Sequence, residues 1–199
     1  MRLLTGLLLA SIISVSHSAL AQRKFLMGVK LGVNVATQEV KGSYPAAVGS
    51  LTRVHVGIIT EQKFGKLGFQ AEAMYSGHGC SYNGIIRKNL KSRFDYINVP
   101  LFAKWYITNN IAIVGGPQFG MIFDQEFQDD RTGVVRRDDF STKYSRFETS
   151  VGGGLEFQLN NGIGCYGRYI YGITKIDEDL PFLTFTKNKT IQFGLSYRF

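Results

Sequence analysis

Apolar and polar residues alternate along much of this chain. At the C-terminus Ile191, Phe193, Leu195, Tyr197 and Phe199 are separated by small or polar residues. Successive side chains of a β-strand point to opposite faces, so this pattern predicts a strand with one apolar and one polar face. Eight segments share the pattern: 25–36, 52–64, 67–76, 96–105, 111–123, 147–159, 163–174 and 191–199.

The connections between these segments alternate between long and short. The long ones have about 12 to 22 residues and follow every odd-numbered segment: 37–51, 77–93, 124–145 and 177–188. The short ones are tight turns near residues 65–66, 108–110 and 160–162, and the last contains Asn-Gly, the favoured hairpin dipeptide. Short periplasmic turns and long external loops typify membrane barrels. Residues 22–199 are therefore predicted to form an all-β, eight-stranded antiparallel up-and-down transmembrane β-barrel.

The polar face of the segments indicates which side points inward. Five basic and three acidic side chains share its parity, with many glycines between them: Lys30, Arg53, Glu72, Lys104, Glu148, Glu156, Arg168 and Arg198. The interior of an eight-stranded barrel is just wide enough to be filled by side chains. We therefore predict that these residues form a structural polar network in the lumen and that the apolar face contacts lipid. The alternative, a soluble β-sandwich, would place the polar residues outside and would not call for so many glycines.

The first 21 residues predict export. Met1-Arg2 is positively charged, residues 3–15 are almost all apolar, and Ala19-Leu20-Ala21 resembles a cleavage site. This arrangement is typical of a cleaved signal peptide over residues 1–21, whereas a membrane anchor needs about 20 apolar residues. The expected location is the outer membrane of a Gram-negative bacterium. Without Arg2 the formal charge of +8 falls to +7, but nucleic acid is not an expected partner of an exported chain with scattered basic residues.

Several motifs resemble those of a known family. They lie early in the first segment, at the start of the fourth, and within the fifth, sixth and seventh: 28–32, 96–101, 115–117, 152–156 and 168–172. With them, residues 25–199 resemble the Bacteroidetes outer-membrane β-barrel domain family, the PorT-like group within the wider OmpA/OmpX-like eight-stranded barrels. The terminal Tyr197-Arg198-Phe199 is similar to the C-terminal signal, ending in Phe199, that the barrel-assembly machinery reads. Some relatives assist secretion, so the resemblance implies a secretion apparatus as a partner, but it identifies the fold better than the activity.

One group of residues raises the possibility of catalysis. Ser76, His78 and Glu72 share a parity, and outer-membrane lipid esterases use such sets. However, residues two apart on a strand face are about 6–7 Å apart, too far for a nucleophile and its base. The parity also points them into the lumen, away from lipid. We expect polar filling of the lumen and no enzyme activity. No motif predicts a metal site, and no cofactor is expected.

The second long connection predicts a lipid contact. Arg87, Lys88, Lys91 and Arg93 have no acid among them, and Arg and Lys bind phosphate well. We predict that they contact the phosphates of lipopolysaccharide; the alternative is a solvated loop. The third connection mixes acids and bases at 129–131 and 136–139, which suits either a docking surface or a solvated loop.

These patterns together predict a monomeric, non-enzymatic barrel with a plugged lumen. Its expected role is structural, surface-interacting or secretion-assisting through its external loops. Its expected partners are outer-membrane lipids, lipopolysaccharide and the barrel-assembly machinery. The rival hypothesis is a narrow channel for small solutes, and a lipid-modifying enzyme is the third.

Overall fold

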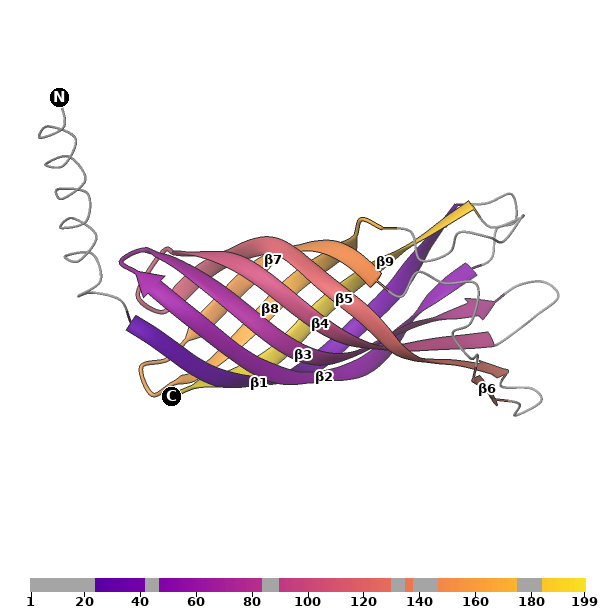
Figure 1. Cartoon of the computed structure of the whole chain (residues 1–199), viewed down its shortest axis with the longest axis horizontal. Helices are drawn as coiled ribbons and strands as arrows, with labels where there is room; N and C mark the ends of the chain where they lie inside the picture. Colours follow the sequence, from indigo (N-terminus) through magenta and orange to yellow (C-terminus); the bar gives the residue numbers. More distant parts are fainter. Residues whose placement is uncertain (1–23, 42–46, 84–89, 130–134, 138–146, 175–183) are drawn as a thin grey trace, which may run out of the picture.

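The computed structural model describes residues 24–41, 47–83, 90–129, 135–137, 147–174 and 184–199. The predicted signal peptide, residues 1–21, lies outside the described residues. Figure 1 shows long, tilted strands wound into a barrel. The strands are β1 (Lys24–Lys41), β2 (Ala47–Phe64), β3 (Leu67–Asn83), β4 (Leu90–Tyr106), β5 (Ile111–Asp129), β6 (Val135–Arg137), β7 (Phe147–Gln158), β8 (Ile163–Gly172) and β9 (Thr184–Arg198). In the part of the chain described, no helix is long and apolar enough to cross a bilayer.

Eight of these strands close into one antiparallel sheet. Their spatial order is β4-β3-β2-β1-β9-β8-β7-β5, and β4 also pairs with β5, which closes the ring. The first and last strands pair directly, with Leu31 opposite Leu195. Strand β6 pairs only with the far end of β5, where Glu126 lies opposite Arg137. The predicted all-β, eight-stranded antiparallel barrel is confirmed.

The strands are longer than the alternating pattern predicts. Strand β1 continues to Lys41, β3 to Asn83 and β5 to Asp129, while β4 begins at Leu90 and β9 at Thr184. Much of the predicted long loops is therefore sheet, and β6 lies in a region predicted to have no regular structure. The reason is that these extensions pass beyond the apolar belt. Their backbone pairing continues, but outward residues there are polar, so the period-two signal ends.

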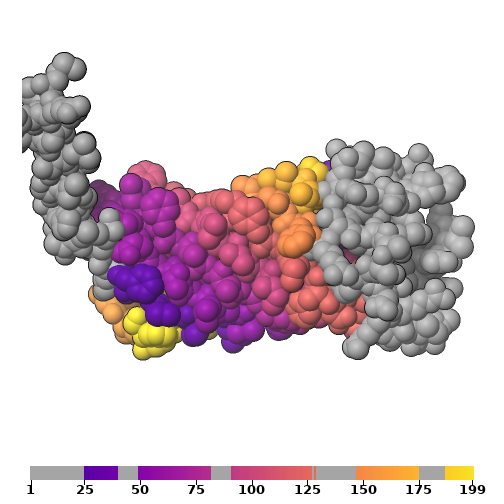
Figure 2. All heavy atoms as spheres, in the orientation of Figure 1, coloured from indigo at the N-terminus to yellow at the C-terminus, as the bar shows by residue number. Residues whose placement is uncertain are grey.

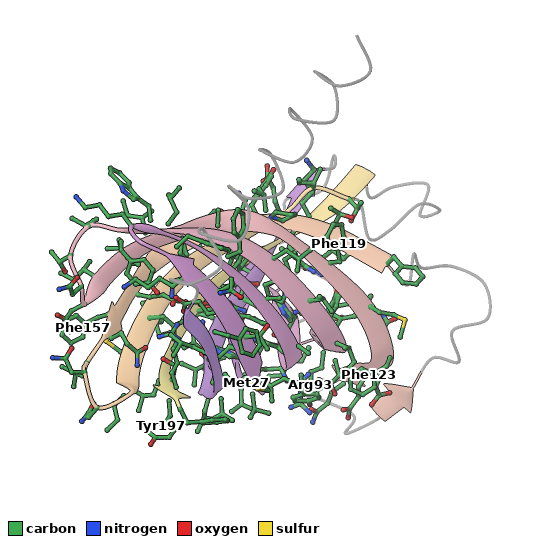
Figure 3. All side chains as sticks on the ribbon, turned by 60° about the vertical axis from the view of Figure 1, so that its left-hand side comes forward. Met27, Arg93, Phe119, Phe123, Phe157 and Tyr197 are labelled. Carbon is green, nitrogen blue, oxygen red and sulfur yellow. The ribbon has the colours of Figure 1, made fainter. Side chains whose placement is uncertain are left out.

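The two faces of the barrel wall differ sharply. Outward side chains are apolar and exposed, as at Leu31 (60%), Leu155 (57%) and Phe193 (52%). Inward side chains are polar and buried, as at Lys30 (1%) and Arg168 (2%). Figure 2 shows the outer side chains of the coloured strands as a continuous wall, and Figure 3 shows Phe123, Phe157 and Tyr197 projecting away from it. This is the predicted orientation, with the apolar parity outside.

The apolar belt matches a bilayer in height. On β1 the outward apolar residues run from Phe25 to Val35, and the next outward positions are Thr37 and Glu39. The ten steps from the first to the last of these residues, at about 3.3 Å each and tilted by about 40°, rise about 25 Å, the height of the apolar band of such barrels. The belt therefore ends where charged residues begin, and the strand extensions lie beyond the hydrocarbon.

Glycines on the inward face make room for the large residues of the lumen. A Cβ on Gly32 would lie 2.7 Å from Nε2 of His55, and a Cβ on Gly194 would lie 2.5 Å from the hydroxyl of Tyr166. That hydroxyl lies 2.5 Å from Nε2 of His55. The pair thus occupies space that only glycine leaves free on the neighbouring strands β1 and β9.

Candidate functional site

The half of the lumen nearer the short turns, which are predicted to be periplasmic, holds a buried cluster of charged side chains, which we call the lumen ion-pair cluster. It comprises four cations and three carboxylates: Lys30, Glu61, Glu72, Lys104, Glu156, Arg168 and Arg198. Glu156 lies at its centre. Its carboxylate accepts hydrogen bonds from Lys30 Nζ at 2.7 Å, Lys104 Nζ at 2.8 Å and Arg198 Nη2 at 2.7 Å, and also from Arg168.

The second carboxylate, Glu72, has two cationic partners. Arg168 donates two hydrogen bonds to it, from Nη1 at 2.9 Å and from Nη2 at 2.6 Å, and Lys30 donates a third at 2.8 Å. Paired N–H donors of a guanidinium fix the geometry of a carboxylate as well as its charge. Arg168 also lies over the ring of Phe102, at 4.7 Å from the centroid. The guanidinium is therefore held on several sides.

The third carboxylate, Glu61, was missed by the sequence analysis. It receives a hydrogen bond from Lys104 Nζ at 2.9 Å and another from the Tyr106 hydroxyl, and Arg198 Nε lies 3.2 Å away. The alternation in its segment is weak around Thr60–Lys63, which hid it. Its parity is nevertheless that of His55 and Gly57, so the inward side of the segment could have been extended to include it.

The cluster crosses the lumen from wall to wall. Its seven members come from seven strands, β1, β2, β3, β4, β7, β8 and β9. Their side chains are at least nine-tenths buried, and the ion pair between Arg168 on β8 and Glu72 on β3 joins opposite sides of the barrel. Buried pairs of this kind resist separation because a charge left alone in the interior is costly. The cluster therefore spans the lumen at this level.

Above the cluster, towards the end with the long connections, the described part of the lumen is polar but carries few charges. Glu148, predicted to belong to the charged network, lies here and not in the cluster. It accepts hydrogen bonds from Asn188 Nδ2 at 2.7 Å and Ser150 Oγ at 3.0 Å. Asn188 also donates to the Tyr96 hydroxyl at 3.1 Å. Side-chain hydrogen bonds thus fill this second layer, with no ion pair to Glu148 from the described residues.

Arg53, also predicted to face the lumen, is directed elsewhere. Its guanidinium pairs with Asp95 at 2.8 Å, and both side chains are partly exposed. A Cβ on Gly77 would meet the Arg53 side chain at 2.8 Å, and Gly77 alternates with the inward-facing Ser76 and His78. Arg53 therefore crosses the outer face. A register shift between Ser50 and His55 explains this, because a bulge re-aims side chains. The lumen assignment of Arg53 was wrong.

The fold brings together only two of the three residues of the possible hydrolytic group, Ser76, His78 and Glu72. Ser76 Oγ lies 2.9 Å from His78 Nε2, so the argument from strand spacing was wrong, because the side chains span the gap. The other imidazole nitrogen contacts the Thr190 hydroxyl at 3.1 Å, and Glu72 is engaged by Lys30 and Arg168 instead. Ser76 and His78 are also buried. The described residues therefore give the pair no carboxylate orienter and no open access.

The predicted lipopolysaccharide contacts fall in two places. Arg87 and Lys88 lie outside the described residues. Lys91 and Arg93 lie in strand β4, not in a loop, and Arg93 Nη1 is 3.8 Å from a carboxylate oxygen of Glu126. Figure 3 shows Arg93 projecting outward. The predicted assembly signal, Phe199, is 68% exposed, and its backbone N–H donates to the Met27 carbonyl oxygen at 2.9 Å.

Metal binding has no candidate among the described residues, since they contain no group of three or more His, Cys, Asp or Glu side chains suited to an ion. The two cysteines differ in setting. Cys80 is buried and its thiol donates to Gln38 Oε1 at 3.0 Å, whereas Cys165 is exposed, and neither forms a disulfide. In the described part of the chain, the side chains that could carry chemistry therefore lie in the packed lumen or at the two ends of the barrel.

The chain is similar to several solved structures. Neisserial surface protein A matches with a TM-score of 0.56 and 12% identity, over 87% of this chain and 97% of that one. OprG from Pseudomonas aeruginosa matches with a TM-score of 0.49 and 16% identity over 88% and 95%. Ail, the attachment invasion locus protein of Yersinia pestis, gives 0.48 and 14% over 88% and 99%. At 12% identity, the similarity to Neisserial surface protein A supports the fold alone.

Sequence comparison gives the family. No curated protein matches the chain. A family model described as the outer membrane protein beta-barrel domain matches residues 16–178, most of the chain. The match agrees with the closed barrel and its apolar outer belt. This chain belongs to the outer membrane protein beta-barrel domain family and is an outer-membrane protein.

Proposed function

We propose that this protein is a non-catalytic, monomeric outer-membrane barrel with a closed lumen, which acts through its external end. The observation that carries the proposal is the lumen ion-pair cluster, in which Glu156 alone bonds four cations from four strands. A solute would have to break several buried ion pairs to pass. Chemistry in the lumen is disfavoured because the Ser76–His78 pair is buried and has no acidic orienter.

The rival hypothesis is a narrow channel, and electrical recording separates the two. The purified protein, inserted in planar bilayers, is expected to give no steady conductance above background, because the cluster blocks the path. A known porin recorded in the same bilayers shows that insertion and detection work. Regular, reproducible steps of conductance from this protein would contradict the closed lumen.

The charged residues at the outer edge of the apolar belt suggest a lipid partner. On β9 the outward apolar residues end at Ile191, and the next outward positions are Lys189 and Lys187. Both ammonium groups lie near the ring of Tyr171 on β8. That of Lys189 is 5.9 Å from the ring centroid and that of Lys187 is 5.2 Å from it. Lys189 also pairs with Glu39 at 2.8 Å, whereas Lys187 has no ion pair with the described residues. This edge therefore carries a surplus positive charge.

Among the described residues, the opposite wall carries no such surplus. There Arg53 pairs with Asp95, Arg93 lies near Glu126, and Lys91 and Asp124 add one charge of each sign. We therefore propose that the β8–β9 edge contacts lipopolysaccharide phosphate, through charge-assisted hydrogen bonds from Lys187 and Lys189. The contacts predicted for Arg87, Lys88, Lys91 and Arg93 remain part of the proposal, as a second region on the other side of the barrel.

Replacing Lys187 and Lys189 together with glutamine tests the lipid contact. Each lysine near an anionic surface contributes about 1 kcal/mol, so the double variant should lose about 30-fold in affinity for lipopolysaccharide in nanodiscs. Lys63→Gln with Lys66→Gln, which removes the same charge at the periplasmic end, is the control and should bind nearly as wild type. Equal losses in both variants would contradict a specific site on the β8–β9 edge.

The finer assignments rest on the sequence. We propose a cleaved signal peptide over residues 1–21, recognition of Phe199 by the barrel-assembly machinery, and membership of the PorT-like group of Bacteroidetes with a role beside a secretion apparatus. The motif resemblance supports the last of these. Normal secretion by a strain that lacks the gene would remove the secretion role and leave the closed barrel intact.

A further inference from the structure

A groove with a volume of about 600 Å³ crosses the outer wall of the barrel over strands β2 to β5. Its floor is made of small outward residues, Ala71 on β3, Ala103 on β4 and Gly115 on β5. The exposed side chains of Phe69 and Leu101 stand beside them. The groove is therefore a hollow in the apolar belt, between large side chains.

The packing of the sheet does not require this hollow. Among the described residues, a Cβ on Gly115 would have one neighbour within 4 Å, the carbonyl oxygen of Gly152 at 3.5 Å, which is an ordinary contact. On the inward face, by contrast, a Cβ on Gly32 would lie 2.1 Å from the carbonyl oxygen of Phe193. Glycine at position 115 therefore leaves open space on the surface that faces lipid.

The groove rises from one edge of the apolar belt to its middle. At its lower end Gln62 pairs with Phe25, the first apolar residue of the belt on β1, and with Phe69 on β3. At its upper end it reaches Pro117, which is the middle residue of the outward apolar series of β5, residues 111–123. The groove thus spans one leaflet of the bilayer, the one on the side of the short turns.

The position of the groove indicates what fills it. It is continuous with the belt that contacts lipid, and the core of a bilayer contains no water to occupy a hollow. An acyl chain lying in the groove would have protein atoms on several sides, and each such contact adds dispersion attraction that a flat wall does not offer. Because the groove spans one leaflet, its length suits one acyl chain.

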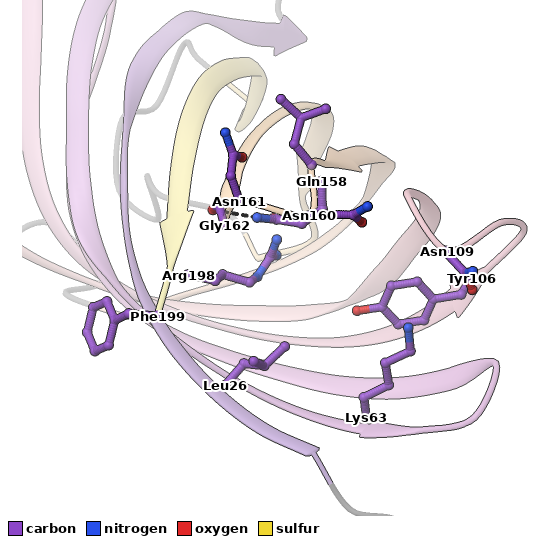
Figure 4. A pocket seen from close by; sticks show the side chains of 11 residues that line it. Leu26, Lys63, Tyr106, Asn109, Gln158, Asn160, Asn161, Gly162, Arg198 and Phe199 are labelled. Atoms are coloured by element: carbon purple, nitrogen blue, oxygen red, sulfur yellow. Dashed lines mark hydrogen bonds between the residues drawn. The ribbon is translucent and has the colours of Figure 1, made fainter.

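Gln62 supplies a polar contact where the groove meets the edge of the belt. The next residue, Lys63, points inward, with its ammonium group 3.8 Å from the centroid of the Tyr106 ring at the barrel mouth (Figure 4), so Gln62 points outward. Its Nε2 is shielded from water and has no hydrogen-bond partner among the described residues. The ester carbonyls of a phospholipid lie where the hydrocarbon begins and can accept a hydrogen bond from such an amide.

We propose that this lipid groove binds one acyl chain of a phospholipid from the leaflet on the side of the short turns, and that the ester carbonyl of that chain accepts a hydrogen bond from Gln62. On the predicted orientation this is the periplasmic leaflet. The site is independent of the proposed external role. The alternative occupant is a second copy of this chain, and the experiment distinguishes the two.

The test is native mass spectrometry of the delipidated protein during a titration with dipalmitoyl phosphatidylethanolamine. We expect saturable binding of one lipid to a monomeric barrel. The ether analogue, which has the same chains and head group but no ester carbonyl, should bind about fivefold more weakly, because it cannot accept the hydrogen bond from Gln62. Absence of a saturable single lipid, or a lipid-free dimer that Ala103→Leu abolishes, would overturn the proposal.

Filling the groove tests its location. Ala103→Leu places a large side chain on the floor, so it should weaken binding of the ester lipid about tenfold. Ala73→Leu is the matched control, since Ala73 is also outward and exposed, on β3, but does not line the groove. Its affinity should stay within about twofold of wild type. Equal affinities of the two folded variants would refute the assignment of the site to this groove.

Replacing Gln62 with leucine tests the carbonyl contact separately. The variant has no amide donor, so it should bind the ester lipid and its ether analogue equally well, with the affinity that the wild type has for the ether analogue. An undiminished preference of Gln62→Leu for the ester lipid would show that Gln62 does not hold the carbonyl.

Discussion

Replacing Glu156 with glutamine is expected to destabilise the barrel by about 3–5 kcal/mol. The substitution keeps the shape of the side chain but removes the negative charge that bonds Lys30, Lys104, Arg168 and Arg198. Four buried cations would then face two carboxylates. Unfolding by urea in lipid vesicles, followed by the fluorescence of Trp105, the one tryptophan of the chain, measures the loss.

Glu126→Gln is the matched control for this prediction. Its carboxylate lies 3.8 Å from Arg93, and both side chains are partly exposed. An exposed pair contributes about 0–1 kcal/mol, so this change should have little effect. Similar losses for the two variants would mean that the lumen ion-pair cluster does not carry the stability assigned to it.

Replacing Leu155 with arginine is expected to cost about 2–4 kcal/mol of folding free energy in a bilayer. Leu155 is 57% exposed on the outer face of β7, between Ile113 on β5 and Gly167 on β8. It lies within the apolar belt, so an arginine there would place a charge in hydrocarbon. The same urea titration in vesicles provides the measurement.

The matched control is Asn160→Arg, in the exposed turn that follows the same strand. An arginine near the interface costs about 0–1 kcal/mol. If Leu155→Arg and Asn160→Arg were tolerated equally well, position 155 would not face lipid, and the outward assignment of the apolar parity would have to be abandoned.

The fold could be predicted from the sequence because one physical rule governs every strand in the bilayer. Lipid requires an apolar residue at each outward position, so alternation marks the strands wherever they cross hydrocarbon. Beyond the belt this requirement ends. The pairing of Glu39 with Lys187 in the β1–β9 ladder has no apolar signature, and the extensions of the strands were therefore read as loops.

Parity also predicted much of the lumen, but not which residues meet there. Lys30, Glu72, Lys104, Glu156, Arg168 and Arg198 do come together in one cluster. Bulges and side-chain length decide the rest.

The register shift before His55 sends Arg53 to the outer face, which no count of alternate positions detects. The reach of the side chains brings Ser76 and His78 within 2.9 Å, although their backbones are two residues apart. Alternation along the sequence therefore predicts which face of the barrel wall a side chain points to. Only the three-dimensional register shows which residue it contacts.

The central claim is that the apolar parity lies in lipid while the other parity fills the lumen. Methyl NMR of the protein in nanodiscs that contain a lipid with a nitroxide in its acyl chain tests it directly. The methyl signals of Leu31, Leu155 and Leu195, which are exposed on the outer face, should broaden strongly. Those of Ile59, Val114 and Ile170, which are buried on the inner face, should stay sharp. Equal broadening of both sets, or broadening of the inner set alone, would contradict the orientation.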